Sequence, residues 1–160
     1  MNPLAWLIGL ALPACGFPAA EGLPTPPLMD VAHIERPSSP NTALAAPTGF
    51  SPPPDIATPH YNLPPDGLFA LVQSVAADQP RTWQAALYTG PLQVHYVARS
   101  AVFNFPDLIM AQVQKDGADG SRLILYSRSV YGESDLGVNR KRVETWLAAL
   151  QTKLPSSNER

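Results

Sequence analysis

The positions of the prolines constrain this chain more than any other feature of its sequence. Fifteen of the nineteen prolines lie before Gly67, and proline lacks the backbone N–H group that helices and sheet ladders use. In contrast, nineteen of the twenty-four Lys, Arg, Asp and Glu residues follow Pro65. The contrast predicts a proline-rich segment with polyproline II character, followed by one charged domain of about 95 residues that is large enough for a modest core.

The first fifteen residues have the pattern of an export leader. Leu4 to Leu12 is an apolar run without charge, too short to span a bilayer, which takes about 20 residues, but suited to a signal peptide. It ends in Leu12-Pro-Ala-Cys15-Gly, which resembles the lipobox of bacterial lipoproteins. The resemblance implies a lipidated Cys15 and a membrane anchor facing the periplasm, with the leaflet undetermined. Cleavage near Ala14 or Ala20 without lipid, and a buried helix with an ordinary core cysteine, stay open.

Residues 16–63 are predicted to form a disordered, proline-rich tether. They contain Pro24-Thr-Pro-Pro27, Pro37-Ser-Ser-Pro40 and Ser51-Pro-Pro-Pro54, and a stiff chain of this kind reaches on the order of 100 Å. The net charge is −3 before Asp66 and +1 after Pro65, so neither part has the broad basic face that nucleic-acid binding requires. With one cysteine, and with His95 as the one histidine of the domain, we expect no disulfide, metal site or cofactor.

Residues 64–155 are predicted to form the folded domain, followed by a disordered tail at 156–160. Hydrophobic periodicity predicts the following elements: a helix at 67–78 with Asp66 as N-cap, strands at 82–88, 92–98, 108–114 and 122–131, and a helix at 138–153. The expected fold is α+β, with a three- to four-stranded antiparallel sheet, a helix before it and a C-terminal helix packed on one face.

Several motifs in this domain are similar to those of one known family. They are Arg99-Ser100, Phe105-Pro-Asp107, Ser127-Arg-Ser129, Ser134-Asp135-Leu-Gly137 and Asn139-Arg-Lys-Arg-Val143. On these motifs residues 68–150 resemble the domain of unknown function 1499 family, found in bacteria and in some plastid proteins. The family has no assigned activity, so the resemblance points to positions without naming a ligand.

The stretch from Ser127 to Arg142 joins the last predicted strand to the last helix and concentrates cations at the helix start, where the helix dipole disfavours them. In one interpretation the contacts are structural, with Asp135 as N-cap, an Arg140–Glu144 pair, and Asp107 bound to an arginine, Arg99 or Arg128. In the other, an anion offsets the cations and the arginines supply forked donors. The ligand-binding candidates are then Arg99, Ser100, Asp107, Ser127, Arg128, Ser129, Asp135, Asn139 and Arg140.

The expected function is that of a membrane-tethered envelope protein with a binding or scaffolding domain. Its ligand would be anionic or polar, such as a phospholipid head group, a cell-wall fragment or an acidic segment of an envelope protein. The alternative is an envelope hydrolase in which His95 activates Ser127 or Ser129. Because the chain has no Gly-x-Ser-x-Gly motif and His95 is expected to face solvent, we name no catalytic residue and favour a protein without enzyme activity.

Overall fold

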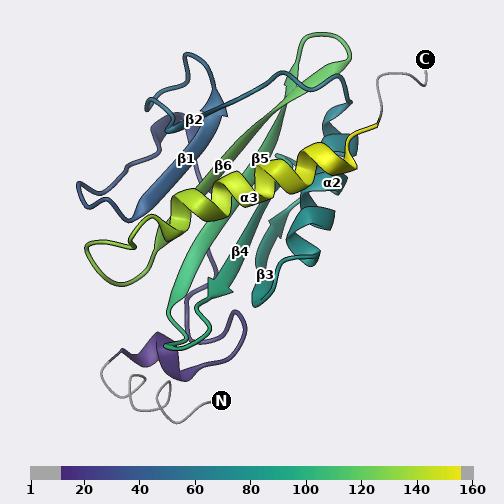
Figure 1. The fold of residues 1–160 in the computed structure, drawn as a ribbon. Helices are drawn as coiled ribbons and strands as arrows, with labels where there is room; N and C mark the ends of the chain where they lie inside the picture. Colours follow the sequence, from purple (N-terminus) through teal and green to yellow (C-terminus); the bar gives the residue numbers. More distant parts are fainter. Residues whose placement is uncertain (1–11, 156–160) are drawn as a thin grey trace.

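The fold is built on a single mixed β-sheet (Figure 1). The structure is a computed structural model, and it describes residues 12–155. The elements in chain order are η1 Pro13–Gly16, η2 Val31–His33, β1 Thr42–Pro47, β2 Ile56–Thr58, α2 Pro65–Ala77, β3 Thr82–Tyr88, β4 Gln93–Arg99, β5 Pro106–Asp116, β6 Gly120–Ser129 and α3 Val138–Lys153. The six strands lie in the order β2-β1-β6-β5-β4-β3. β1 and β2 are parallel, and the other neighbouring strands are antiparallel.

The predicted sheet of three or four antiparallel strands is therefore wrong, although the fold is α+β. The two further strands, β1 and β2, are formed by residues 42–47 and 56–58, inside the segment predicted to be a tether. The reason is local, because residues 41–46 contain no proline and keep the N–H groups that a ladder needs. This stretch pairs with β6 from Thr42 opposite Arg128 to Ala45 opposite Leu125.

Both helices pack on the same face of the sheet (Figure 1). Alternate residues of β4, β5 and β6 point to this side, such as Tyr96, Ile109 and Leu125, and form the larger core with the apolar sides of α2 and α3. The rings of Tyr96 and Trp146 meet edge to face with centroids 5.6 Å apart. The predicted packing of the C-terminal helix on one face is confirmed, and α3 covers the predicted residues 138–153.

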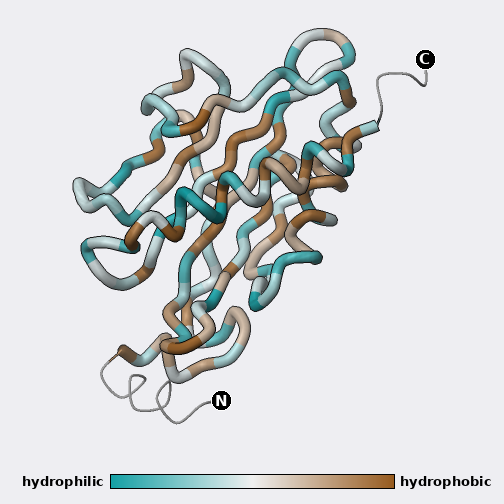
Figure 2. Tube along the Cα trace, in the orientation of Figure 1, coloured by the Kyte–Doolittle hydropathy of each residue, from teal (hydrophilic) through white to brown (hydrophobic). Residues whose placement is uncertain are grey.

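The opposite face is covered by N-terminal chain instead of helices. Residues 23–30, which we call the strap, run across it, and Gln93 binds the backbone of Met29 with both amide atoms, at 2.7 and 2.9 Å. Tyr88 Oη also donates to the carbonyl of Pro26, at 2.7 Å. A second core lies on this face, around Leu44, Met110, Ile124 and Tyr126. Figure 2 accordingly shows hydrophobic residues along the central strands.

No helix within residues 12–155 combines the length and the apolar character needed to cross a membrane.

Candidate functional site

The nine predicted ligand-binding residues lie in several separate places. Six of them gather on the helix-covered face or at the start of α3, while Arg99 and Ser100 lie at the lower end of β4 in Figure 1, and Arg128 lines the strap-covered face. Two rules cause the separation. Successive side chains of a strand point to opposite faces, and β5 lies between β4 and β6.

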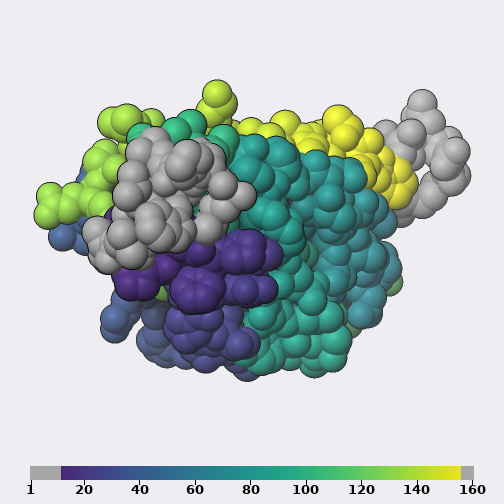
Figure 3. All heavy atoms as spheres, turned by 90° about the horizontal axis from the view of Figure 1, so that it is seen from below, coloured from purple at the N-terminus to yellow at the C-terminus, as the bar shows by residue number. Residues whose placement is uncertain are grey.

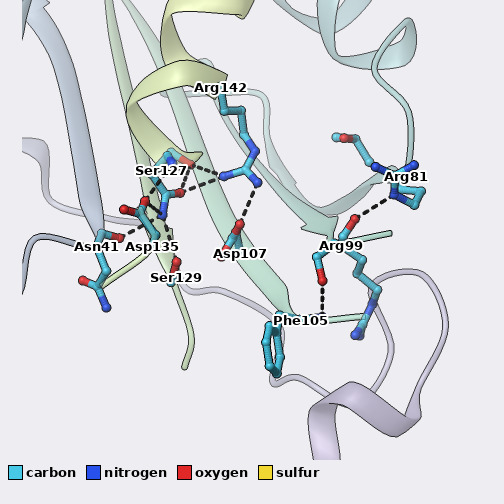
Figure 4. Close-up of polar contacts among 12 residues, drawn as sticks. Asn41, Arg81, Arg99, Phe105, Asp107, Ser127, Ser129, Asp135 and Arg142 are labelled. Carbon is cyan, nitrogen blue, oxygen red and sulfur yellow. Dashed lines mark hydrogen bonds and ion pairs between the residues drawn. The ribbon is translucent and has the colours of Figure 1, made fainter. Parts of the chain in front are cut away.

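On the helix-covered face, Asn139 is the centre of a buried hydrogen-bond network. Figure 4 labels its partners Asn41, Ser127, Ser129 and Asp135. Its Nδ2 lies 2.9 Å from the carbonyl of Asn41, 2.9 Å from Ser129 Oγ and 2.7 Å from Asp135 Oδ2. Its Oδ1 accepts from Ser127 Oγ at 2.5 Å. The network fastens the first turn of α3 to both β6 and the residue before β1.

Two of the three cations at the start of α3, Arg140 and Arg142, have partners within the chain. Arg142 forms an ion pair with Asp107, with Nη2 2.6 Å from Oδ2 (Figure 4), and Arg140 pairs with Glu144 at 3.0 Å as the sequence predicts. The predicted partners of Asp107, Arg99 or Arg128, are wrong because both arginines point to the opposite face of the sheet.

The prediction of Asp135 as N-cap is wrong, because α3 begins at Val138 and Gly137 occupies the N-cap position, but Asp135 still binds the start of α3. The two carboxylate oxygens of Asp135 accept from the backbone N–H groups of Gly137, at 2.9 Å, and Asn139, at 2.7 Å. Together with the ion pairs, these contacts give Asp135, Arg140 and Arg142 partners within the chain. Arg142, which the sequence analysis left out of its site residues, belongs to this network. Its spacing of three residues from Asn139 on a predicted helix was the available clue.

Arg99 is a buried cation that binds backbone carbonyls at one end of the sheet. Nε donates to the carbonyl of Ala19 at 2.5 Å, Nη2 to that of Glu21 at 2.8 Å and Nη1 to that of Ala14 at 2.8 Å. Burial lowers the pKa of Arg99. Arg99 therefore fastens residues 14–21 to the sheet, and we call this contact the clamp.

Two further residues complete the clamp region. Asn104 Nδ2 donates to the carbonyls of Cys15, at 2.8 Å, and Phe17, at 2.9 Å, while Ser100 Oγ accepts from the N–H of Phe105 at 2.9 Å (Figure 4). Cys15 is fully buried, and burial raises the pKa of its thiol. Residues 16–21, which the sequence predicts to begin a tether, are thus bound to the domain together with residues 14 and 15.

A cavity of about 390 Å³ lies between the strap and the central strands. Its lining is mostly apolar and comprises Leu23, Pro24, Thr25, Pro26, Pro27, Met29, His95, Leu108, Ile109, Met110, Tyr126, Arg128 and Val130. We call it the strap pocket. A wider hollow of about 580 Å³ adjoins it and shares Met29, Tyr126 and Arg128 with it.

Two polar groups of the strap pocket lack partners in the described part of the chain. Arg128 is half-buried, and its guanidinium forms no hydrogen bond or ion pair with residues 12–155. The hydroxyl of Tyr126 is buried without a well-oriented hydrogen-bond partner in the same range, although Thr42 lies near enough to affect its pKa. Burial raises that pKa, and the charges of Arg128 and Arg36 oppose the rise.

His95 also lines the strap pocket, and its predicted exposure to solvent is wrong. The residue is 4% exposed because the strap covers its face of the sheet. Its Nε2 lies 2.7 Å from Gln93 Oε1, and burial lowers its pKa to about 4. Ser127 and Ser129 contact α3 on the other face, so the Ser–His pair of the hydrolase alternative does not form.

The buried His95 predicts a specific loss of stability in acid. Its pKa is about 4 in the folded chain and about 6.5 when unfolded. As the pH falls from about 6.5 to about 4, the unfolded state binds a proton that the folded state does not. His95 should then reduce the free energy of unfolding by up to about 3 kcal/mol. Urea unfolding at pH 7.0 and 4.5 measures this, and His95→Gln should show a smaller decrease than the wild type. Equal decreases would contradict the assignment.

The domain matches one known protein family over most of its length. Residues 34–150 match the model of a family described as protein of unknown function (DUF1499). The match covers well over half of the chain and includes β1 and β2, as well as the elements after residue 64. The comparison with curated proteins found no match.

Proposed function

Since the chain belongs to the DUF1499 family of proteins of unknown function, we propose from its site that it binds a small amphipathic anion in the strap pocket. The observation that carries the proposal is Arg128, a half-buried cation without a partner among residues 12–155, at an apolar cavity. The ligand class is an alkyl chain with a carboxylate or phosphate head. The sequence predicts a domain that binds an anionic or polar ligand, and we propose amphipathic anions as the specific ligand class.

The apolar part of the pocket supports the alkyl chain. Its walls are prolines and aliphatic side chains of the strap on one side, and Leu108, Ile109 and Met110 of β5 on the other. A volume of about 390 Å³ lies within the range of small-molecule sites, roughly 300–1,000 Å³. Apolar surface buried here contributes on the order of 25 cal/mol per Å² to binding.

The polar part supports an anionic head group. A partly desolvated guanidinium without a counter-charge is unfavourable, and two oxygens of a carboxylate or phosphate group would accept two parallel hydrogen bonds from it. The Tyr126 hydroxyl, buried and without a well-oriented partner in the described residues, supplies one further donor. Neutral polar ligands offer Arg128 no such compensation, so the proposal favours anions over them.

The proposed setting is the cell envelope, with Cys15 as the site of lipid attachment, on the evidence of the leader-like sequence. A lipidated Cys15 would leave the buried position that it has in the full-length chain. Amphipathic anions of this class are abundant in membranes, which agrees with that setting. Thiol labelling of the urea-unfolded chain purified from membranes distinguishes the two states of Cys15, because a free thiol reacts and a lipidated one does not.

Calorimetric titration of the full chain tests the binding proposal. We expect dodecanoate and dodecyl phosphate to bind, and dodecyl maltoside and inorganic phosphate to bind at least tenfold more weakly. Arg128→Gln should weaken binding of both anions about 10- to 100-fold, because it removes charge-assisted hydrogen bonds of about 1.5–3 kcal/mol.

The matched control is Arg140→Gln, which removes an exposed arginine bound to Glu144 and should leave binding unchanged. Absence of heat with either anion, or equal affinities for wild type and Arg128→Gln, would overturn the proposal.

A further inference from the structure

Large apolar side chains are exposed at the end of the domain that carries the clamp. Phe17, Val102 and Phe103 are 44%, 51% and 42% exposed. They lie on two loops that Asn104 joins through its hydrogen bond to the carbonyl of Phe17. We call these three residues the apolar tip. Figure 3 looks onto this end, with the N-terminal segment beside the rest of the domain.

The two segments that carry the tip contain no charged side chain. Neither residues 12–20 nor residues 100–106 include Asp, Glu, Lys or Arg. Arg99 behind them is buried, and the exposed residues Glu21 and Arg81, whose carbonyls bind Arg99, flank them. Phe103 and Phe105 pack together with ring centroids 5.4 Å apart. Exposed apolar surface without charge is typical of a site that contacts a membrane or another protein.

The course of the chain favours a membrane as the partner. The described residues begin at Leu12, beside η1 at this same end, and the residues before it in sequence, 4–11, are apolar and uncharged. Either anchor, this run in an uncleaved chain or a lipid on Cys15 in a cleaved one, therefore brings the tip to the same surface. The clamp keeps the distance short, because Arg99 binds the carbonyls of residues 14–21 directly.

We propose that the apolar tip inserts into the surface of a lipid bilayer, so that the domain rests on the membrane instead of standing off on a long tether. The proposal is independent of the strap pocket and its ligand. It assigns Phe17, Val102 and Phe103 to the acyl boundary, and it directs the hairpin loop at 117–119, at the other end of β5 and β6, away from the membrane.

Flotation of the full chain with vesicles of phosphatidylcholine and phosphatidylglycerol tests the proposal. The double variant Phe17→Ser, Phe103→Ser should partition into vesicles at least tenfold less than the wild type. The matched control is Leu87→Ser, since Leu87 is similarly exposed, at 41%, but lies near the other end of β3. Equal partitioning of the double variant and wild type, or an equal loss in the control, would overturn the proposal.

A second measurement needs no substitution. Vesicles should slow amide hydrogen exchange at residues 101–104 of the wild-type chain and leave residues 117–119 unchanged. If the tip instead binds a second copy, the wild type would sediment as a dimer and the double variant as a monomer, with unchanged flotation. That outcome would also overturn the membrane proposal.

Discussion

Asn139→Ala is expected to lower the free energy of unfolding by about 2–4 kcal/mol. The substitution removes a fully buried amide that bonds to Asn41, Ser127, Ser129 and Asp135. The cost exceeds that of one hydrogen bond because the buried carbonyl of Asn41 and the hydroxyl of Ser127 lose partners that water cannot readily replace. Urea unfolding followed by circular dichroism measures the change.

The adjacent residue provides the control for this prediction. Arg140→Ala removes an exposed pair with Glu144, and we expect a change within about 0.5 kcal/mol. Both substitutions introduce alanine into the first turn of α3, and the gain in helix propensity is larger for asparagine than for arginine, so helix propensity does not explain a larger destabilisation by Asn139→Ala. A decrease of less than 1 kcal/mol for Asn139→Ala would show that the network contributes little to stability.

Arg99→Ala is expected to increase the rate of thiol labelling of Cys15 about 100-fold in the folded chain. Arg99 is the donor for the carbonyls of Ala14, Ala19 and Glu21, and its loss should lower the free energy of local opening by about 3 kcal/mol. In the wild type, burial both shields the Cys15 thiol and raises its pKa, so labelling is slow. The measurement is maleimide labelling followed by mass spectrometry.

The control for the clamp is Arg122→Ala, which removes a sheet arginine that contacts Gln114 near the opposite end of β6. Its labelling rate should match that of the wild type. The labelling rate of each folded chain is divided by the rate of the same chain unfolded in urea. Labelling of the unfolded chain also shows whether the Cys15 thiol is free to react. If Arg99→Ala labels as slowly as the wild type, residues 14–21 are held by contacts other than the clamp.

Elements with strong periodicity were predicted well from the sequence. The helix at 138–153 and the strand at 82–88 have the predicted bounds. A hydrophobic pattern that repeats over several helical turns, or over several residues of a strand, is compatible with few other secondary structures. β1 was missed because the average composition around it is proline-rich. A short run without proline, residues 41–46, becomes a strand once β6 offers it a partner.

The candidate site was predicted only in part. The sequence placed Ser127 and Asn139 in one motif-rich run and offered Asp107 as a further candidate from a separate motif. The structure shows the three in one network with Arg142. The strap pocket was not predicted, because its walls come from segments that are far apart in the chain. Period-two alternation put His95 on the face opposite Tyr96 correctly, but no local pattern shows whether that face meets solvent or another part of the chain.

By itself, therefore, the sequence determined the family motifs, the α+β class and most elements of the domain, because propensity and periodicity are local properties of the chain. Tertiary structure decided which partners the charged residues have: Asp107 binds Arg142, Arg99 binds backbone carbonyls, and Arg128 has no partner among residues 12–155. It also decided that the proline-rich segment covers a sheet face. The physical reason is that ion pairing and burial depend on distances between residues remote in sequence, which the register of the sheet and the path of the strap establish together.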